Sequence, residues 1–173
     1  MTRLALAVGL TAGVVLLALG LARAAKAPAA SPAVAADLER VLAAPLPGAP
    51  RYIAGYRKWL KINRKPIPNS PTTAHPATVK DVFVNRKSFP RTAKFRLPYG
   101  TILVKEGRSD DGTVVLLAVM RKIKGADPKH NDWSFIEYTR SSASDRFGVQ
   151  AKGAICWGCH QGVAQRDYVW TKR

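Results

Sequence analysis

The sequence predicts an α+β fold, in which helices flank an antiparallel β-sheet of about four to five strands. Two runs alternate apolar and polar residues and are rich in β-branched side chains, and a third run is rich in aromatic ones. Turn residues separate these runs at short intervals, and strands joined by short turns pair antiparallel. One segment nearer the N-terminus repeats its apolar residues at spacings of three and four, which is typical of a helix.

Residues 1–25 have the pattern of a secretory signal peptide. Arg3 lies near the start, the run from Leu4 to Ala22 carries no charge, and small residues surround Arg23. We therefore expect export to the periplasm and removal of this segment. An uncleaved membrane anchor stays open as the alternative, because the uncharged run approaches the roughly 20 residues that span a bilayer.

Residues 26–50 are dominated by alanine and proline, which offer too little large apolar surface to pack a core. This composition predicts a tether with one short helix over residues 37–42, followed by a single domain over residues 51–173. Within that domain, a helix is expected over residues 52–62, where apolar residues recur at helical spacing. The prolines of residues 65–76 predict an open loop.

The strands are expected in the second half of the chain. Residues 79–84 and 101–104 alternate with a period of two. The pair Asp111-Gly112 predicts a hairpin between a strand over residues 102–107 and a strand over residues 114–123. A second turn, rich in glycine, aspartate and asparagine, leads into an aromatic strand over residues 133–139. The pattern therefore predicts an antiparallel meander.

The chain is strongly basic, with a formal net charge of +17. Such a charge attracts nucleic acid, anionic membrane surfaces or acidic proteins. Export makes nucleic acid the poorest of these partners, so we expect no nucleic acid and favour an acidic partner protein. Because the cations are scattered along the sequence, a solvated basic surface without a partner stays open.

The most informative motif is the run CWGCH at residues 156–160, which holds the only cysteines of the chain. Its spacing predicts one covalently attached haem c, bound through Cys156 and Cys159, with His160 as the proximal iron ligand. A redox-active dithiol usually follows an early strand of a βαβ unit, whereas this run lies near the C-terminus. A zinc site would need a further ligand such as His75 or His130, and a disulfide would close a very small loop.

The late position of the motif bears on the second axial ligand. Electron-transfer cytochromes c place the motif near the N-terminus and take a methionine ligand from far downstream. Here thirteen residues follow His160, and Met120 is the only methionine outside the signal, where it fits the core of a strand. We therefore expect a five-coordinate iron with one face open to a small molecule.

Beyond the motif, the chain resembles the cytochrome P-460 family, which includes the cytochromes c′-beta. Five short segments carry the resemblance, in the family's order: Asp81–Asn85, Tyr99–Glu106, Ala118–Lys122, Asn131–Phe135 and Asp167–Trp170. The resemblance implies an antiparallel sheet with flanking helices, often a homodimer, that holds one haem with an open face for nitrogen species. In founding members, a lysine at the position of Lys105 cross-links to the porphyrin, and hydroxylamine is oxidised to nitric oxide or nitrous oxide. Cytochromes c′-beta lack the cross-link and bind nitric oxide in an apolar pocket.

Two positions bear on the choice between these activities. Lys105 shares a strand face with Leu103, so its amine is either buried and nucleophilic or solvated at a sheet edge. Hydroxylamine oxidation also needs a base, but the resemblance places the family's distal carboxylate within residues 116–119, which are wholly apolar. The acids that could replace this carboxylate are Glu106, Asp132 and Glu137. His75 and His130 could serve as a base or as a sixth iron ligand, or could be surface residues.

We therefore predict an exported mono-haem c-type cytochrome that acts on hydroxylamine or nitric oxide. Cys156, Cys159 and His160 hold the haem in this hypothesis, and Lys105 is the position of the cross-link. The alternative is a non-catalytic haem protein that binds nitric oxide or carries electrons to an acidic redox partner.

Overall fold

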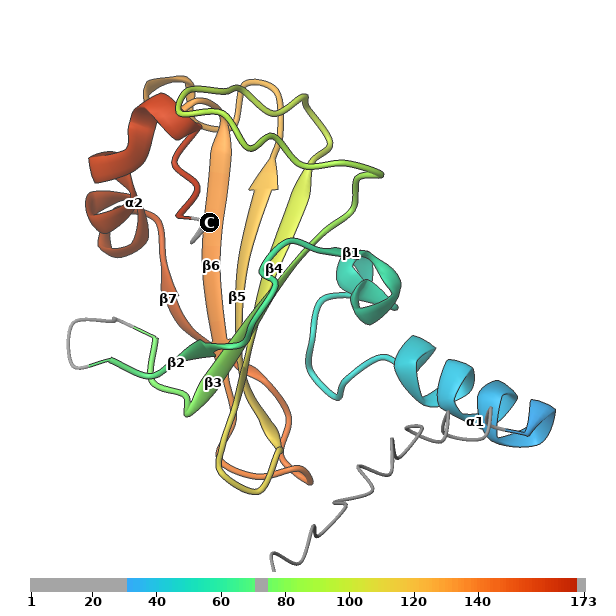
Figure 1. Cartoon of the computed structure of the whole chain (residues 1–173). Helices are drawn as coiled ribbons and strands as arrows, with labels where there is room; N and C mark the ends of the chain where they lie inside the picture. The colour runs from blue at the N-terminus through green and yellow to red at the C-terminus, as the bar shows by residue number, and fades with distance from the viewer. Residues whose placement is uncertain (1–30, 71–74, 171–173) are drawn as a thin grey trace, which may run out of the picture. The chain divides into compact units, whose positions relative to one another are not determined.

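The computed structural model describes residues 31–70 and 75–170, and its centre is an antiparallel β-sheet (Figure 1). The strands of the described residues are β1 (Leu60–Lys61), β2 (Ile67–Pro68), β3 (Val79–Val84), β4 (Ile102–Arg108), β5 (Val114–Lys122), β6 (Trp133–Thr139) and β7 (Gly148–Lys152). They follow the order β1-β3-β4-β5-β6-β7, and β2 also pairs with β3. Every pairing among them is antiparallel, so the predicted α+β fold is confirmed, with more strands than expected.

The four central strands lie where the sequence predicted them. β3 and β6 have the predicted bounds, and β4 and β5 each differ by one residue at the C-terminal end. Their hairpin closes with the Ser109 amide, which donates to the Thr113 carbonyl oxygen at 3.0 Å. Burial along these strands does not alternate strictly, because both faces of the sheet are packed. Their β-branched and aromatic residues, and the turns between them, are the signals that located them.

The additional strands lack that signal. β1 and β2 are two residues long, too short for any alternation. β7 lies at the edge of the sheet, and four of its five residues are exposed, including Val149 at 60%. A strand that buries little apolar surface shows no hydrophobic period.

The helix predicted over residues 52–62 is wrong. Two single-turn 3-10 helices occupy its first part, η1 (Arg51–Ile53) and η2 (Tyr56–Lys58), and β1 occupies its second part. Gly55 separates the two turns with a φ of 70°, a left-handed conformation that interrupts a right-handed helix. Ile53 and Tyr56 are buried as the apolar pattern required, so the core residues were identified although the helix was not.

Helix α1 (Pro32–Ala43) contains the short helix expected over residues 37–42, and none of its residues is buried. The predicted signal peptide, residues 1–25, lies outside the described residues, as do the first residues of the predicted tether. No helix within the described ranges is long and apolar enough to cross a membrane.

The two faces of the sheet are covered by different parts of the chain. The first face carries Phe83 and Leu117 and packs against residues 46–59. The second face carries Leu103 and Met120 and packs against the C-terminal elements α2 (Ala154–His160) and η4 (Gln161–Arg166), which follow η3 (Pro128–His130) and β7 in the chain (Figure 1). The CWGCH run thus lies against the second face.

Candidate functional site

Helix α2 presents the CWGCH run to the sheet. It begins after Gly153, whose φ of 63° and ψ of −124° favour glycine, and whose carbonyl oxygen accepts hydrogen bonds from the amides of Cys156 at 2.9 Å and Trp157 at 3.0 Å. Residues three and four apart on a helix are neighbours. The helix therefore brings Cys156, Cys159 and His160 to one side.

The two thiols differ in their surroundings. Both cysteines are free, Cys156 is half-buried and Cys159 is exposed. Burial raises the pKa of the Cys156 thiol, and the nearby Glu137 carboxylate and Cys159 act in the same direction. Both sulfur atoms are thus available for covalent attachment, and one of them borders the hollow described below.

The imidazole of His160 is held in one orientation. Its Nδ1 donates a hydrogen bond to the carbonyl oxygen of Tyr168 at 2.7 Å, and its ring meets the ring of Phe135 edge-on at 5.2 Å. Burial lowers the pKa of His160 to about 4, helped by the charges of Lys105 and His75 and opposed by the hydrogen bond to Tyr168. A neutral imidazole with its proton on Nδ1 leaves the Nε2 lone pair for a metal.

An apolar hollow lies between α2 and the second face of the sheet. Its floor comes from four adjacent strands, which contribute Val82, Leu103, Met120 and Phe135, and it opens to solvent on one side. Hollows of this kind are typical sites for cofactors. Two thiols and an imidazole at the edge of an apolar floor are the donor set of a c-type haem, so the residues present fit this group.

Lys105 lines the hollow together with Leu103, as the alternation in β4 predicted. Burial, together with the positive charge of Lys80, lowers the pKa of Lys105 to about 8 against the opposing effect of the Glu137 carboxylate. Within the described residues, no hydrogen bond or ion pair engages the Lys105 amine. Near pH 8, part of this amine is therefore neutral and nucleophilic.

Of the three acids that the sequence offered as bases, only Glu137 lines the hollow in the described part of the chain. Its carboxylate pairs with Nδ1 of His75, which lines the same hollow. Asp132 instead accepts a hydrogen bond from the Tyr99 hydroxyl at 2.8 Å. The hollow thus contains a carboxylate and an imidazole in direct contact.

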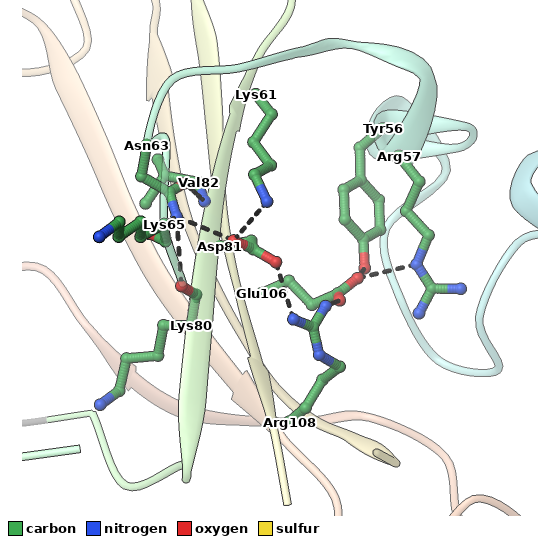
Figure 2. Close-up of polar contacts among 10 residues, drawn as sticks. All are labelled: Tyr56, Arg57, Lys61, Asn63, Lys65, Lys80, Asp81, Val82, Glu106 and Arg108. Atoms are coloured by element: carbon green, nitrogen blue, oxygen red, sulfur yellow. Dashed lines mark hydrogen bonds and ion pairs between the residues drawn. The ribbon is translucent and has the colours of Figure 1, made fainter. Parts of the chain in front are cut away.

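Glu106 lies on the opposite face of the sheet and is wrong as a candidate base. Its carboxylate accepts hydrogen bonds from the Tyr56 hydroxyl, from Arg57 Nε at 2.8 Å and from Arg108 Nη1 at 2.7 Å (Figure 2). Arg108 also donates to Asp81 at 2.7 Å. Asp81 also pairs with Lys61 at 3.0 Å and accepts a hydrogen bond from Asn63 at 2.8 Å, so the ionic cluster around Glu106 and Asp81 ties residues 56–63 to β3 and β4.

The other candidates of the sequence have clear positions. Residues 116–119 are apolar as predicted, and Ala118 and Val119 line the hollow without a polar group. Met120 also lines the hollow and is 8% exposed. His130 does not line it: its ring stacks on Trp157 at 3.9 Å, and its Nδ1 bonds to Asp127 at 2.6 Å.

Two features of the site carried no sequence signal. The partners of the His75–Glu137 pair are 62 residues apart, and the Tyr168 carbonyl that orients His160 is a backbone group. Only the register of the sheet and the path of the C-terminal segment bring these groups to the hollow.

Comparison with known proteins bears on the nature of this site. A family model described as Cytochrome P460 matches residues 53–171, which include every residue of the hollow. No curated protein matches the chain.

Proposed function

The chain belongs to the cytochrome P460 family of haem proteins, and from this premise we propose that it is an exported mono-haem c-type cytochrome that acts on hydroxylamine. In this proposal, the Cys156 and Cys159 thiols attach the haem covalently, and Nε2 of His160 binds its iron. A bound haem would supply an iron centre that binds a nitrogen compound and accepts its electrons. The remaining chemistry is the task of side chains in the hollow.

The observation that best supports turnover is the His75–Glu137 pair in the hollow that His160 borders. Oxidation of hydroxylamine to nitric oxide releases three electrons and three protons, so it needs a nearby proton acceptor. The Glu137 carboxylate can accept a proton, and the adjacent His75 imidazole can pass it on towards solvent. This pair would replace the carboxylate that residues 116–119 lack.

Lys105 supports the same proposal from the neighbouring strand. Its amine faces the hollow, and burial lowers its pKa to about 8. A C–N bond between this amine and a porphyrin carbon would replace one N–H and one C–H bond and release two protons and two electrons, so it would need a two-electron oxidant. A partly neutral amine has the lone pair that such a bond requires. We propose Lys105 as the residue of the porphyrin cross-link that the family's founding members carry.

A second function is favoured by the apolar floor of the hollow. Ala118, Val119 and Phe135 offer no polar group to a bound ligand, and an apolar pocket suits an uncharged gas. The alternative is therefore a non-catalytic protein that binds nitric oxide, like the cytochromes c′-beta.

The electron acceptor is proposed to be an acidic redox protein that docks on the basic loop, residues 86–96. The loop contains no acidic residue, and its exposed cations are Lys87, Arg91, Lys94 and Arg96. It is anchored beside η4, where the Phe95 amide donates to the Gln165 carbonyl oxygen at 3.2 Å. The positive surface thus adjoins the segment that follows His160, which suits electrostatic docking near the haem.

The first experiment is production of the full chain in a bacterium that attaches haem c, followed by mass measurement under denaturing conditions. A retained mass of one haem supports covalent attachment, and the mass of the polypeptide alone would exclude it. Reduced absorption spectra with and without nitric oxide then report on the open face.

The second experiment separates turnover from gas binding with one pair of variants. Glu137→Gln should lower hydroxylamine oxidation by about 10²–10⁴-fold, because it removes the proton acceptor, and should leave nitric oxide binding intact. Glu39→Gln is the matched control, because Glu39 lies on the exposed helix α1. Nitric oxide binding without any hydroxylamine oxidation by the natural chain would favour the alternative.

A further inference from the structure

The carboxylate of Asp167 is completely buried just beyond η4. It accepts hydrogen bonds from Lys122 Nζ at 2.5 Å, from the Leu97 amide at 2.8 Å and from Asn131 Nδ2 at 3.1 Å. Arg96 adds a longer contact of 3.4 Å. These donors come from β5, from the turn before β6 and from the loop before β4, so one side chain ties three parts of the domain to the C-terminal segment.

The backbone at this point adopts an uncommon conformation. Asp167 and Tyr168 have φ values of 53° and 64°, and two successive left-handed residues that are not glycine are unfavourable on their own. Such a turn persists only where surrounding contacts hold it. The turn is held by the contacts of the Asp167 carboxylate and by the amides of Asp167 and Tyr168, which donate to the carbonyl oxygens of Ala164 and Val163.

The turn has one direct consequence for the site. It directs the Tyr168 carbonyl oxygen to Nδ1 of His160, at 2.7 Å. The strength of this hydrogen bond governs how much electron density the imidazole can give through Nε2. The Asp167 carboxylate lies one residue from this carbonyl and does not itself touch His160.

We propose that Asp167 is a positioning residue for His160. Its carboxylate, paired with Lys122, locks the left-handed turn, and the turn holds the Tyr168 carbonyl on Nδ1 and so sets the donor strength of the proximal ligand. This inference rests on the proposed role of His160 as iron ligand. It assigns to Asp167 an effect on the iron–histidine bond and on the reduction potential, beyond a contribution to folding.

The test uses the intact haem protein and the variant Asp167→Asn, which keeps the shape of the side chain and removes its charge. The resonance Raman band of the iron–histidine stretch in the ferrous form should shift to lower frequency, and the midpoint potential should rise. Both changes follow from a weaker hydrogen bond at Nδ1, because a less electron-rich imidazole stabilises the oxidised iron less.

Two further variants separate positioning from general destabilisation. Asp81→Asn removes a carboxylate with comparable ion pairs on the opposite face of the sheet, and it should leave band and potential unchanged. Asn131→Gly removes a single donor to Asp167, and glycine accepts the φ of 57° found there. It should shift band and potential in the same direction as Asp167→Asn by a smaller amount, which keeps the test valid if Asp167→Asn does not fold.

The outcomes distinguish this inference from the proposed function. A natural protein without covalent haem or without an iron–histidine band overturns both. A natural protein with both features, whose band and potential are unchanged in Asp167→Asn or in Asn131→Gly, overturns only the role of Asp167. An equal shift of band and potential in Asp81→Asn would also overturn the role of Asp167, because the shift would then reflect only a loss of stability.

Discussion

The substitution Glu106→Gln tests how much the ionic cluster contributes to stability. The Glu106 side chain is 3% exposed and accepts from Tyr56, Arg57 and Arg108 (Figure 2). Breaking a buried ion pair by neutralising one partner costs about 3–5 kcal/mol, because it leaves the other charge uncompensated. Here Arg108 keeps its pair with Asp81, and Arg57 is 22% exposed and can be hydrated. The substitution should therefore lower the free energy of unfolding by about 3 kcal/mol, the lower end of this range.

This loss can be measured by urea unfolding followed by circular dichroism, with Glu39→Gln as the control. Glu39 is 62% exposed in its ion pair with Lys58, so its substitution should change the free energy of unfolding by less than about 1 kcal/mol. The haem spectrum of Glu106→Gln should equal that of the natural protein, because Glu106 lies on the face away from the hollow. A loss below about 1 kcal/mol, or an altered spectrum, would refute the reasoning.

Three further predictions concern the hollow, the acid limit of stability and the basic loop. Lys105→Met should retain haem by mass and lose any red-shifted, cross-linked absorption; an unchanged spectrum would remove Lys105 from the chemistry. Burial acts to raise the pKa of Asp81, but hydrogen bonds from Arg108, Asn63 and Lys61 together lower it below its ordinary value of 3.8, so the free energy of unfolding should fall as the pH drops below 3.8. In Asp81→Asn, the free energy of unfolding should decrease less between pH 3.8 and lower pH than in the natural protein. An equal decrease in both proteins would contradict this prediction. Reversing the charges of the basic loop, residues 86–96, should slow oxidation of the reduced haem by ferricyanide at low salt, with the difference vanishing at high salt; equal rates at low salt would remove the loop from docking.

The strands could be predicted because β-branched and aromatic residues gather in them and turn residues separate them, both of which are local features of the sequence. β3 to β6 each place consecutive residues on opposite faces, and both faces are packed. The segment around Gly55 shows where this approach fails. Its apolar spacing fitted a helix, but the glycine ends the first turn, and Leu60 then pairs with Val84 at the edge of the sheet. Tertiary pairing overrode the local preference.

Some residues of the candidate site could likewise be predicted from the sequence, and others could not. Cys156, Cys159 and His160 could be singled out as candidates because a haem c attachment motif has a fixed local spacing, whereas the strand showed only that Lys105 shares a face with Leu103 and left open whether that face is buried. The choice of Glu137 among the acids could not be made from the sequence, because it depends on which face each strand turns to the hollow and on the loop that brings His75 there. Local chemistry was predictable, and chemistry assembled across the sheet was not.

Lys105 and Glu106 show how one strand serves both stability and the site. They are consecutive, yet Glu106 meets two guanidinium groups on one face while the Lys105 amine faces the hollow on the other. A slip of one residue in β4 would exchange them, placing a lysine among arginines and a carboxylate on the apolar floor. The pairing of Leu103 with Met120 specifies the same register through apolar contacts. Because two independent sets of contacts fix the register, removing the charge of Glu106 should lower the stability of the domain without moving Lys105 out of the hollow.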